Sequence, residues 1–175
     1  MKKIYKYLFV LVFALVSILV ACDRTVEKTD LEKALEATVS ECKTFEVLTT
    51  INQGEYEIYK ETANYSFSDG KFSYTSTVKK LNSLDSEEEF TTTEKEGKVD
   101  SAYFLELSVD LLEDVTVENG VLKAKLSVSG LEKLVNKDAK DGSLELKFND
   151  DKVVALVLVY TLNGQKTKIE ANYSY

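Results

Sequence analysis

Residues 63–75 read Ala63-Asn64-Tyr65-Ser66-Phe67-Ser68-Asp69-Gly70-Lys71-Phe72-Ser73-Tyr74-Thr75. The Asp69-Gly70 pair is a strong hairpin signal, because both residues tolerate a positive φ. On each side of this turn, aromatic side chains share one phase and small or charged side chains share the other. One aromatic face and one polar face predict two strands of a half-buried antiparallel sheet.

Similar alternation predicts strands through most of the remaining chain. We expect strands over 44–51, 55–68, from 71 through Val78, 153–162 and 166–175, with turns at 53–54 and 149–151 and a clear hairpin at Asn163-Gly164. A phase change predicts a bulge or bend near Tyr59–Thr62. Residues 90–95 and 98 onward are predicted to form a hairpin around Glu96-Gly97, and 143–148 a further strand.

Two stretches of the middle region leave alternatives open. Residues 103–111 match the period of a strand and also that of a helix; we favour a strand that ends in a short helical turn over 111–114. Residues 115–117 and 121–128, on either side of Asn119-Gly120, form a strand pair or a strand and a loop. A short echo also stands out, since residues 63–67 recur at 171–175 with one change. We interpret it as convergent strand patterning rather than a duplication.

Two helices are predicted from capping boxes. The first begins with Thr29-Asp30-Leu31-Glu32. Its apolar stripe must lie on another element; the stripe consists of Leu31, Ala34, Leu35, Thr38, Val39 and Cys42. The second, shorter helix opens with Ser129-Gly130-Leu131-Glu132 and carries Leu131, Leu134 and Val135. The fold class is therefore α+β: a curved antiparallel sheet of about eight to ten strands, with a helix on its concave face.

Composition excludes several classes of function. The 175-residue chain has no His, which removes the usual general base and the commonest metal ligand. Two Cys cannot build a disulfide framework or a four-thiolate zinc site. A formal net charge of −8 argues against nucleic-acid binding. We therefore expect no enzyme activity, no catalytic residue, no cofactor and no metal site.

The first 22 residues carry a targeting pattern. Three lysines precede an apolar run over 7–21, which is long enough for a signal peptide and short for a membrane span. The run ends Leu19-Val20-Ala21-Cys22. This ending resembles the lipobox of bacterial lipoproteins. The resemblance implies cleavage between Ala21 and Cys22 and a diacylglycerol on the Cys22 sulfur.

These expectations divide the chain into a cleaved signal peptide (1–21), a lipidated tether (22–28) and a single domain (29–175). Loss of residues 1–21, which hold three Lys and no acid, leaves 154 residues and takes the net charge from −8 to −11. The alternative is an uncleaved N-terminal anchor. Both readings place the domain outside the cytoplasm on a membrane, and two acyl chains suffice for stable anchoring.

Two further features of the sequence are candidate sites. Cys42 lies on the apolar stripe, so we predict a small buried side chain; the alternative is a free thiol that dimerises or senses oxidants. A second feature is an acidic stretch between residues 85 and 100, which is predicted to be solvated rather than to bind a cation. Residues 137–142 fail the EF-hand pattern at its first and third positions. The acidic residues are Asp85, Glu87, Glu88, Glu89, Glu94, Glu96 and Asp100.

The strands carry more aromatic side chains than two short helices can cover. An incompletely covered curved sheet would leave an apolar groove, the usual basis for binding an acyl chain. The order of elements resembles the half-barrel of the LolA/LolB and LppX-like lipoproteins, which implies lipid binding on the concave face but assigns no ligand-binding residue. The first hypothesis is a lipoprotein that binds an apolar ligand; the alternative is a closed-core interaction lipoprotein with an acidic protein-binding surface.

Overall fold

The computed structural model describes residues 28–82, 90–99, 107–149 and 151–175. In these ranges the chain forms one nine-stranded sheet, two α-helices and one 3-10 turn. The strands are β1 (Thr44–Gln53), β2 (Tyr56–Ser68), β3 (Lys71–Leu81), β4 (Phe90–Val99), β5 (Leu112–Glu118), β6 (Val121–Leu126), β7 (Lys140–Asn149), β8 (Lys152–Leu162) and β9 (Gln165–Ser174). The nine strands confirm the predicted sheet.

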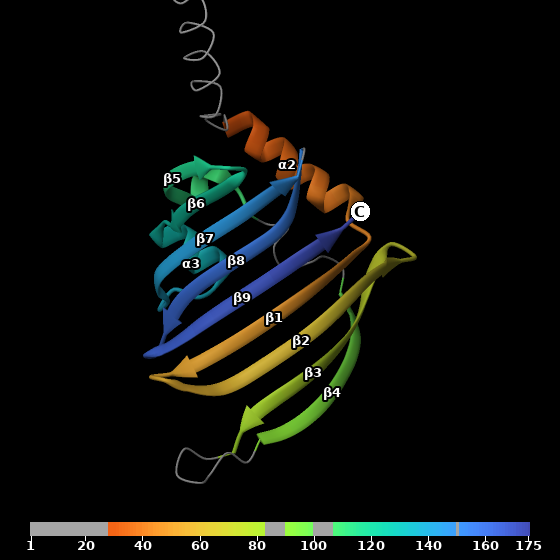
Figure 1. The fold of residues 1–175 in the computed structure, drawn as a ribbon, viewed down its shortest axis with the longest axis vertical. Coiled ribbons are helices and arrows are strands. Elements are labelled where there is room, and N and C mark those ends of the chain that lie inside the picture. The colour runs from red at the N-terminus through yellow and green to blue at the C-terminus, as the bar shows by residue number, and fades with distance from the viewer. Residues whose placement is uncertain (1–27, 83–89, 100–106, 150) are drawn as a thin grey trace, which may run out of the picture.

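The sheet consists of two antiparallel meanders that meet in its middle. Its strand order is β4-β3-β2-β1-β9-β8-β7-β6-β5, so the first and last strands of the chain are neighbours (Figure 1). The predicted turns at Asp69-Gly70, Asn119-Gly120 and Asn163-Gly164 each place two successive residues at positive φ. These are the dihedral angles that tight hairpins require, which explains why the sequence located them.

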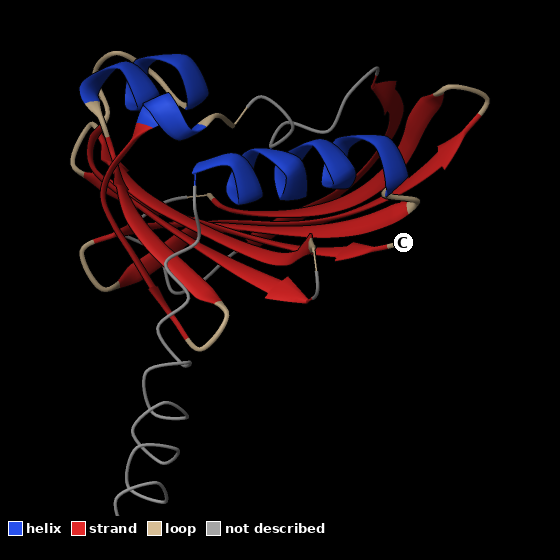
Figure 2. Cartoon of the chain, turned by 90° about the horizontal axis from the view of Figure 1, so that it is seen from above, coloured by secondary structure: helices blue, strands red, loops and turns tan. Residues whose placement is uncertain are grey.

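Both helices lie on the concave side of the sheet, as Figure 2 shows. Helix α2 (Lys28–Glu41) packs over β8, and α3 (Val128–Leu134) lies against β6 and the 3-10 turn η2 (Val109–Leu111). We call the helix-bearing face the inner face and the opposite one the outer face. The predicted position of the helices is confirmed.

The core lies between the helices and the inner face. It joins Leu31 of α2, and Cys42 directly after this helix, to apolar residues of most strands. The largest fully buried side chains all belong to β6, β7 and β8: Leu122, Leu144, Leu146, Leu158 and Val153. The half of the sheet beneath the helices is therefore filled by tightly buried aliphatic side chains.

The C-terminal half of α2 is tied to the sheet by polar contacts. The Tyr175 hydroxyl lies 3.0 Å from Thr38 Oγ1 and also contacts the main-chain oxygen of Val153. Lys152 forms an ion pair with Glu41, and its ammonium lies 4.8 Å from the centre of the Tyr175 ring. These contacts join α2 to the start of β8 and the end of β9.

The predicted hairpin at Glu96-Gly97 is wrong. Strand β4 runs unbroken through both residues, and Gly97 lies opposite Tyr74 of β3. A Cβ at Gly97 would stand 2.8 Å from Tyr74 Cε1. The glycine therefore makes room for an aromatic ring and does not turn the chain.

The predicted strand over 103–111 is wrong for its described part, residues 107–111. Residues 100–106 lie outside the described part of the chain, residues 107–108 are not in a strand, and Val109–Leu111 form the 3-10 turn η2. The helical turn thus comes earlier than predicted, and Leu112 already begins β5. Residues 115–117 and 121–128 form the strand pair rather than a strand and a loop, although β6 ends at Leu126.

Three local boundaries also differ. Helix α2 begins at Lys28, so Thr29 lies inside the helix and is not its cap. Helix α3 is capped by Ser127, whose side chain accepts a hydrogen bond from Gly130 N at 3.0 Å, and not by Ser129. The predicted bulge is present but lies at Ile58, where Ile51 pairs with Tyr59 and the next residue of β1 pairs with Glu57.

Candidate functional site

The predicted lipidation site, Ala21-Cys22, lies outside the described residues, so the signal peptide and lipid anchor remain predictions. Cys42 is 6% exposed at the end of α2 and donates a hydrogen bond to the Thr44 main-chain oxygen at 3.3 Å. Burial raises the pKa of its thiol, against a smaller opposing effect of backbone hydrogen bonds from Ser174 and Thr44. A buried, protonated thiol fits the predicted role in core packing.

Only part of the acidic stretch lies within the described residues. Glu94 and Glu96 lie on the exposed edge strand β4, and the other acidic residues singled out above fall outside the described ranges. In the described part of the chain, no group of three or more Cys, Asp and Glu side chains is placed to hold a metal ion. Asp138 and Asp141 of the failed EF-hand segment are both exposed.

The inner face of β1–β3 carries a row of aromatic rings. Phe45 stacks on Tyr65 with ring centres 4.2 Å apart, and Tyr65 lies 5.4 Å from Tyr74. Phe45 also contacts Tyr173 at 5.8 Å. Helix α2 packs over β8, so the row of rings extends beyond the area that the helix covers. Tyr65 and Tyr74 are therefore only half-buried. This is the aromatic face that the sequence predicted.

A buried hydroxyl lies within this apolar face. Ser76 follows Tyr74 on the same side of β3, opposite Ala63, and is 4% exposed. Within the described residues, its Oγ has no hydrogen-bond partner. A buried hydroxyl without a partner costs about 1–3 kcal/mol, so it marks a place where a ligand atom or water could bind.

The next positions along the inner face are polar. Glu61, two residues before Ala63, accepts a hydrogen bond from the Tyr59 hydroxyl at 2.7 Å. Burial, followed by the bond to Glu61 and its charge, raises the pKa of Tyr59. Lys95 faces Ser76 from the edge strand and is exposed. The aromatic row, the small residues and this charged rim together suit an amphipathic ligand.

A hollow with a volume of about 820 Å³ lies on the outer face of β1–β4. We call it the outer groove. Most of its lining residues fall into two cross-strand rows that point away from the helices, because they alternate with the buried aromatic row. One row is Ser174, Thr44, Ser66, Ser73 and Lys98; the other is Glu46, Asn64, Thr75 and Glu96.

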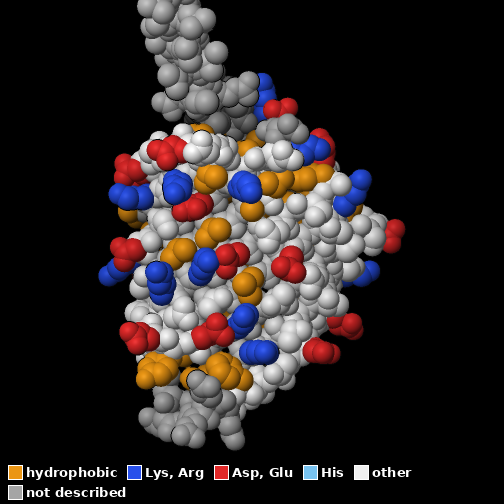
Figure 3. Space-filling view, in the orientation of Figure 1, with side chains coloured by type: hydrophobic (Ala, Val, Ile, Leu, Met, Phe, Trp, Pro, Cys, Tyr) orange, Lys and Arg blue, Asp and Glu red, His pale blue; other side chains and the backbone are white. Residues whose placement is uncertain are grey.

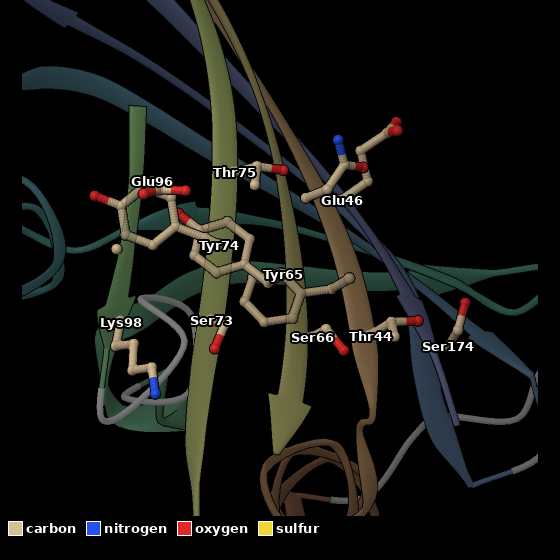
Figure 4. Close-up of a pocket in the computed structure, with 13 residues that line it drawn as sticks. Thr44, Glu46, Tyr65, Ser66, Ser73, Tyr74, Thr75, Glu96, Lys98 and Ser174 are labelled. Atoms are coloured by element: carbon tan, nitrogen blue, oxygen red, sulfur yellow. The ribbon is translucent and has the colours of Figure 1, made fainter. Parts of the chain in front are cut away.

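The side chains of the two rows are hydroxyl, amide or charged groups, and Phe45, Tyr65, Tyr74 and Gly97 line the groove between the rows. Glu96 and Lys98 border it on β4 and Glu46 borders it on β1, with hydroxyl groups between them (Figure 4). A second hollow of about 540 Å³ adjoins it and shares Asn64, Thr75 and Glu96. In Figure 3, charged side chains are scattered over an outer face whose other polar side chains are drawn in white. This surface does not resemble a site for an acyl chain.

The sequence did not identify the outer groove or Ser76 as sites. Alternation did assign Ser73 and Thr75 to the polar face of β3, but a polar phase normally means only contact with water. Twelve of its thirteen lining residues lie on β1–β4, which follow one another along the chain, and the other is Ser174 of β9. The alternation of these strands does not indicate that their polar face holds a hollow. The signal that could have indicated it is the repeated Ala-Asn-Tyr-Ser motif, whose two copies flank β1.

No described helix is both long enough and apolar enough to cross a membrane. The chain matches no protein-family model, and a search of curated proteins finds no match. Among solved structures, it is similar to the crystal structure of LprF from Mycobacterium bovis. The two share 10% sequence identity and a TM-score of 0.48, over 87% of this chain and 94% of the other.

Proposed function

We propose that this chain is a non-enzymatic lipoprotein, anchored to the outer side of a membrane through Cys22, that binds an apolar ligand on the inner face of its sheet. The observation that carries the ligand proposal is Ser76. Its hydroxyl is buried and has no hydrogen-bond partner among the residues that the structure describes; it lies next to half-buried Tyr74 and opposite the small side chain of Ala63.

The chemistry of this site favours a ligand with one hydrogen-bonding atom in an otherwise apolar body. Tyr65 and Tyr74 offer ring surface for a hydrocarbon chain, and the nearby Ala63 has only a small side chain. The Ser76 hydroxyl could donate to an ester or carboxyl oxygen, which would remove the cost of leaving it unpaired. An acylated lipid carries both kinds of group.

The ligand test uses the full chain purified in detergent from the cells that produce it. Organic extraction followed by mass spectrometry would identify non-covalently bound lipid, and we expect close to one lipid molecule per chain. Ala63→Phe, which places an aromatic ring opposite Ser76, should lose that lipid. Ser73→Ala, on the outer side of the same strand, is the matched control and should retain it. A lipid-free wild-type chain would refute the proposal.

The anchor has a separate test. Cells grown with labelled palmitate should incorporate the label into the wild-type chain, since the lipid would be attached to Cys22. Cys22→Ala should carry no label and should leave the membrane fraction. Cys42→Ala is the matched control and should still be labelled, because the Cys42 thiol is buried in the core.

The second candidate is an interaction lipoprotein with a closed core. The observation in its favour is the low exposure of the inner face, where Phe45, Phe72 and Val78 are 4%, 3% and 6% exposed. Such a core leaves no space for a ligand, and binding would then use an acidic surface such as β4. The extraction experiment separates the two, since a closed core yields no lipid from any variant.

A further inference from the structure

The outer groove has the properties of a second binding site, separate from the inner face by the thickness of the sheet. Five polar side chains of the groove form no hydrogen bond in the described part of the chain: those of Thr44, Asn64, Ser66, Ser73 and Thr75. Glu46, Glu96 and Lys98 form no ion pair there either. The donors and acceptors are therefore open to a ligand.

The register of the sheet arranges these groups as a ladder. Asn64 lies between Glu46 and Thr75, and each row places one side chain on each successive strand. Neighbouring strands are about 4.8 Å apart, close to the length of about 5 Å that one β-linked pyranose unit adds to a saccharide chain. An extended peptide repeats its side chains on one face about every 6.6 Å, which fits this ladder less well.

The chemistry of the ladder also matches a saccharide. Hydroxyl and amide side chains both donate and accept hydrogen bonds, as sugar hydroxyls do. Phe45, Tyr65 and Tyr74 also line the groove, but they alternate with these polar side chains along the strands, so their rings lie on the inner face. A polyhydroxylated ligand is the class that would satisfy these groups.

The charges indicate which saccharides fit. Glu46 and Glu96 stand at opposite ends of one row, and Glu94 and Lys95 line the adjoining hollow. Lys98 is the cation whose side chain belongs to the two rows of the outer groove. The excess of carboxylates favours a ligand that carries ammonium groups.

We propose that the outer groove binds a linear β-linked oligosaccharide that bears amino groups. The sugar units would lie across β4, β3, β2 and β1, about one unit per strand, with ammonium groups toward Glu46 and Glu96. This site is independent of the apolar ligand proposed for the inner face, and either could exist without the other.

The test is calorimetric titration of the full chain in a polyoxyethylene detergent, which contains no sugar. The probes are the β-1,4-linked dimer and tetramer of glucosamine. We expect the tetramer to bind at least tenfold more tightly than the dimer, because it reaches more strands. The N-acetylated tetramer, which lacks the ammonium groups, should bind more weakly than the glucosamine tetramer.

Two sets of variants connect binding to the groove. Asn64→Leu with Thr75→Val keeps the side-chain shapes and should lower the affinity for the tetramer at least tenfold. Glu46→Gln with Glu96→Gln should abolish the preference for the amino form. Ser143→Ala, at an exposed position on β7 away from the groove, is the control and should bind as the wild type does. Circular dichroism confirms that each variant is folded before titration.

Three results would overturn the proposal. The first is a wild-type chain that binds neither tetramer. The second is an affinity unchanged by the two pairs of substitutions, which would place the saccharide elsewhere. The third is tetralysine binding as tightly as the glucosamine tetramer, which would reveal an acidic surface that recognises charge alone and not sugar.

Discussion

Tyr65 of β2 and Tyr173 of β9 lie at matching positions on the two sides of Phe45. The match extends along β1, since Ala63 and Ala171 both pair with Val47. The two copies of the Ala-Asn-Tyr-Ser echo therefore occupy equivalent environments around one central strand. The shared residues thus have shared structural neighbours, and convergent strand patterning stays a prediction.

Phe45 should be among the residues on which folding depends most. It is 4% exposed and its ring contacts the rings of Tyr65, Phe72 and Tyr173. Phe45→Ala should lower the free energy of unfolding by about 3–5 kcal/mol, the usual cost of removing a buried aromatic ring. Urea unfolding followed by circular dichroism measures the loss.

The matched control is Phe90→Ala, because Phe90 lies on the edge strand β4 and is 37% exposed. We expect it to cost less than half as much as Phe45→Ala. Equal losses would contradict the assignment of Phe45 to the centre of the core.

Tyr175→Phe tests the connection between α2 and the sheet. The substitution removes a hydroxyl that contacts Thr38 and the main chain of Val153 but keeps the ring beside Lys152. It should cost about 1–2 kcal/mol of unfolding free energy. Tyr160→Phe is the control, because the Tyr160 hydroxyl has no hydrogen bond in the described ranges; a loss as large there would argue against the connection.

Several hairpins were predictable because their signals are local. Asp69-Gly70 and Asn163-Gly164 supply positive φ values, and the flanking alternation fixes which side chains face the core. The pairing of β1 with β9 was not predictable, because it joins Thr44 to Ser174 across almost the whole domain. The outer groove lies mainly across β1–β4, and it was missed because a polar phase on such strands normally indicates only contact with water.

The wrong predictions share a cause. Gly97 and the 103–111 stretch were assigned from local pattern, but in the structure tertiary contacts determine them. Gly97 makes room for Tyr74, and Leu111 forms a 3-10 turn whose main-chain oxygen accepts a hydrogen bond from Ser127 N at 2.9 Å. Neither partner is identifiable from the neighbouring sequence.

Stability should fall steeply in alkaline solution because of Tyr173. Burial, more than the nearby Cys42 and Tyr175, raises the pKa of its phenol above the usual value of about 10.0. The folded chain then keeps this proton while the unfolded chain loses it, so stability is full below about pH 10 and declines as the pH rises further.

Tyr173→Phe removes this contribution. Above pH 10 the unfolding free energy of the variant should fall less steeply than that of the wild type, by about 1.4 kcal/mol per pH unit for one proton. Urea unfolding at several pH values between 9 and 11 measures both slopes. Parallel slopes would mean that Tyr173 ionises as readily in the folded chain as in the unfolded one.

Ser127→Ala and Ser129→Ala distinguish the observed helix cap from the one the sequence predicted. The Ser127 side chain accepts the Gly130 N–H, so its loss should cost about 1 kcal/mol. Ser129 contacts only the Ser127 hydroxyl, at 2.9 Å, and its replacement should cost less. Thermal unfolding of the two variants measures both losses of stability. If Ser129 were the cap, Ser129→Ala would cost more than Ser127→Ala.

Gly130 and Gly97 should differ sharply in their tolerance of a methyl group. A Cβ at Gly130 would stand 2.4 Å from the Leu111 main-chain oxygen, which is held by the Ser127 N–H and cannot move freely. Gly130→Ala should therefore cost about 3 kcal/mol, whereas Gly97→Ala should cost about 1 kcal/mol, since only the Tyr74 ring must shift. In a Tyr74→Ala background, Gly97→Ala should cost nothing further by urea unfolding, because the ring that it displaces is gone; a persistent cost would place the conflict in the backbone of β4.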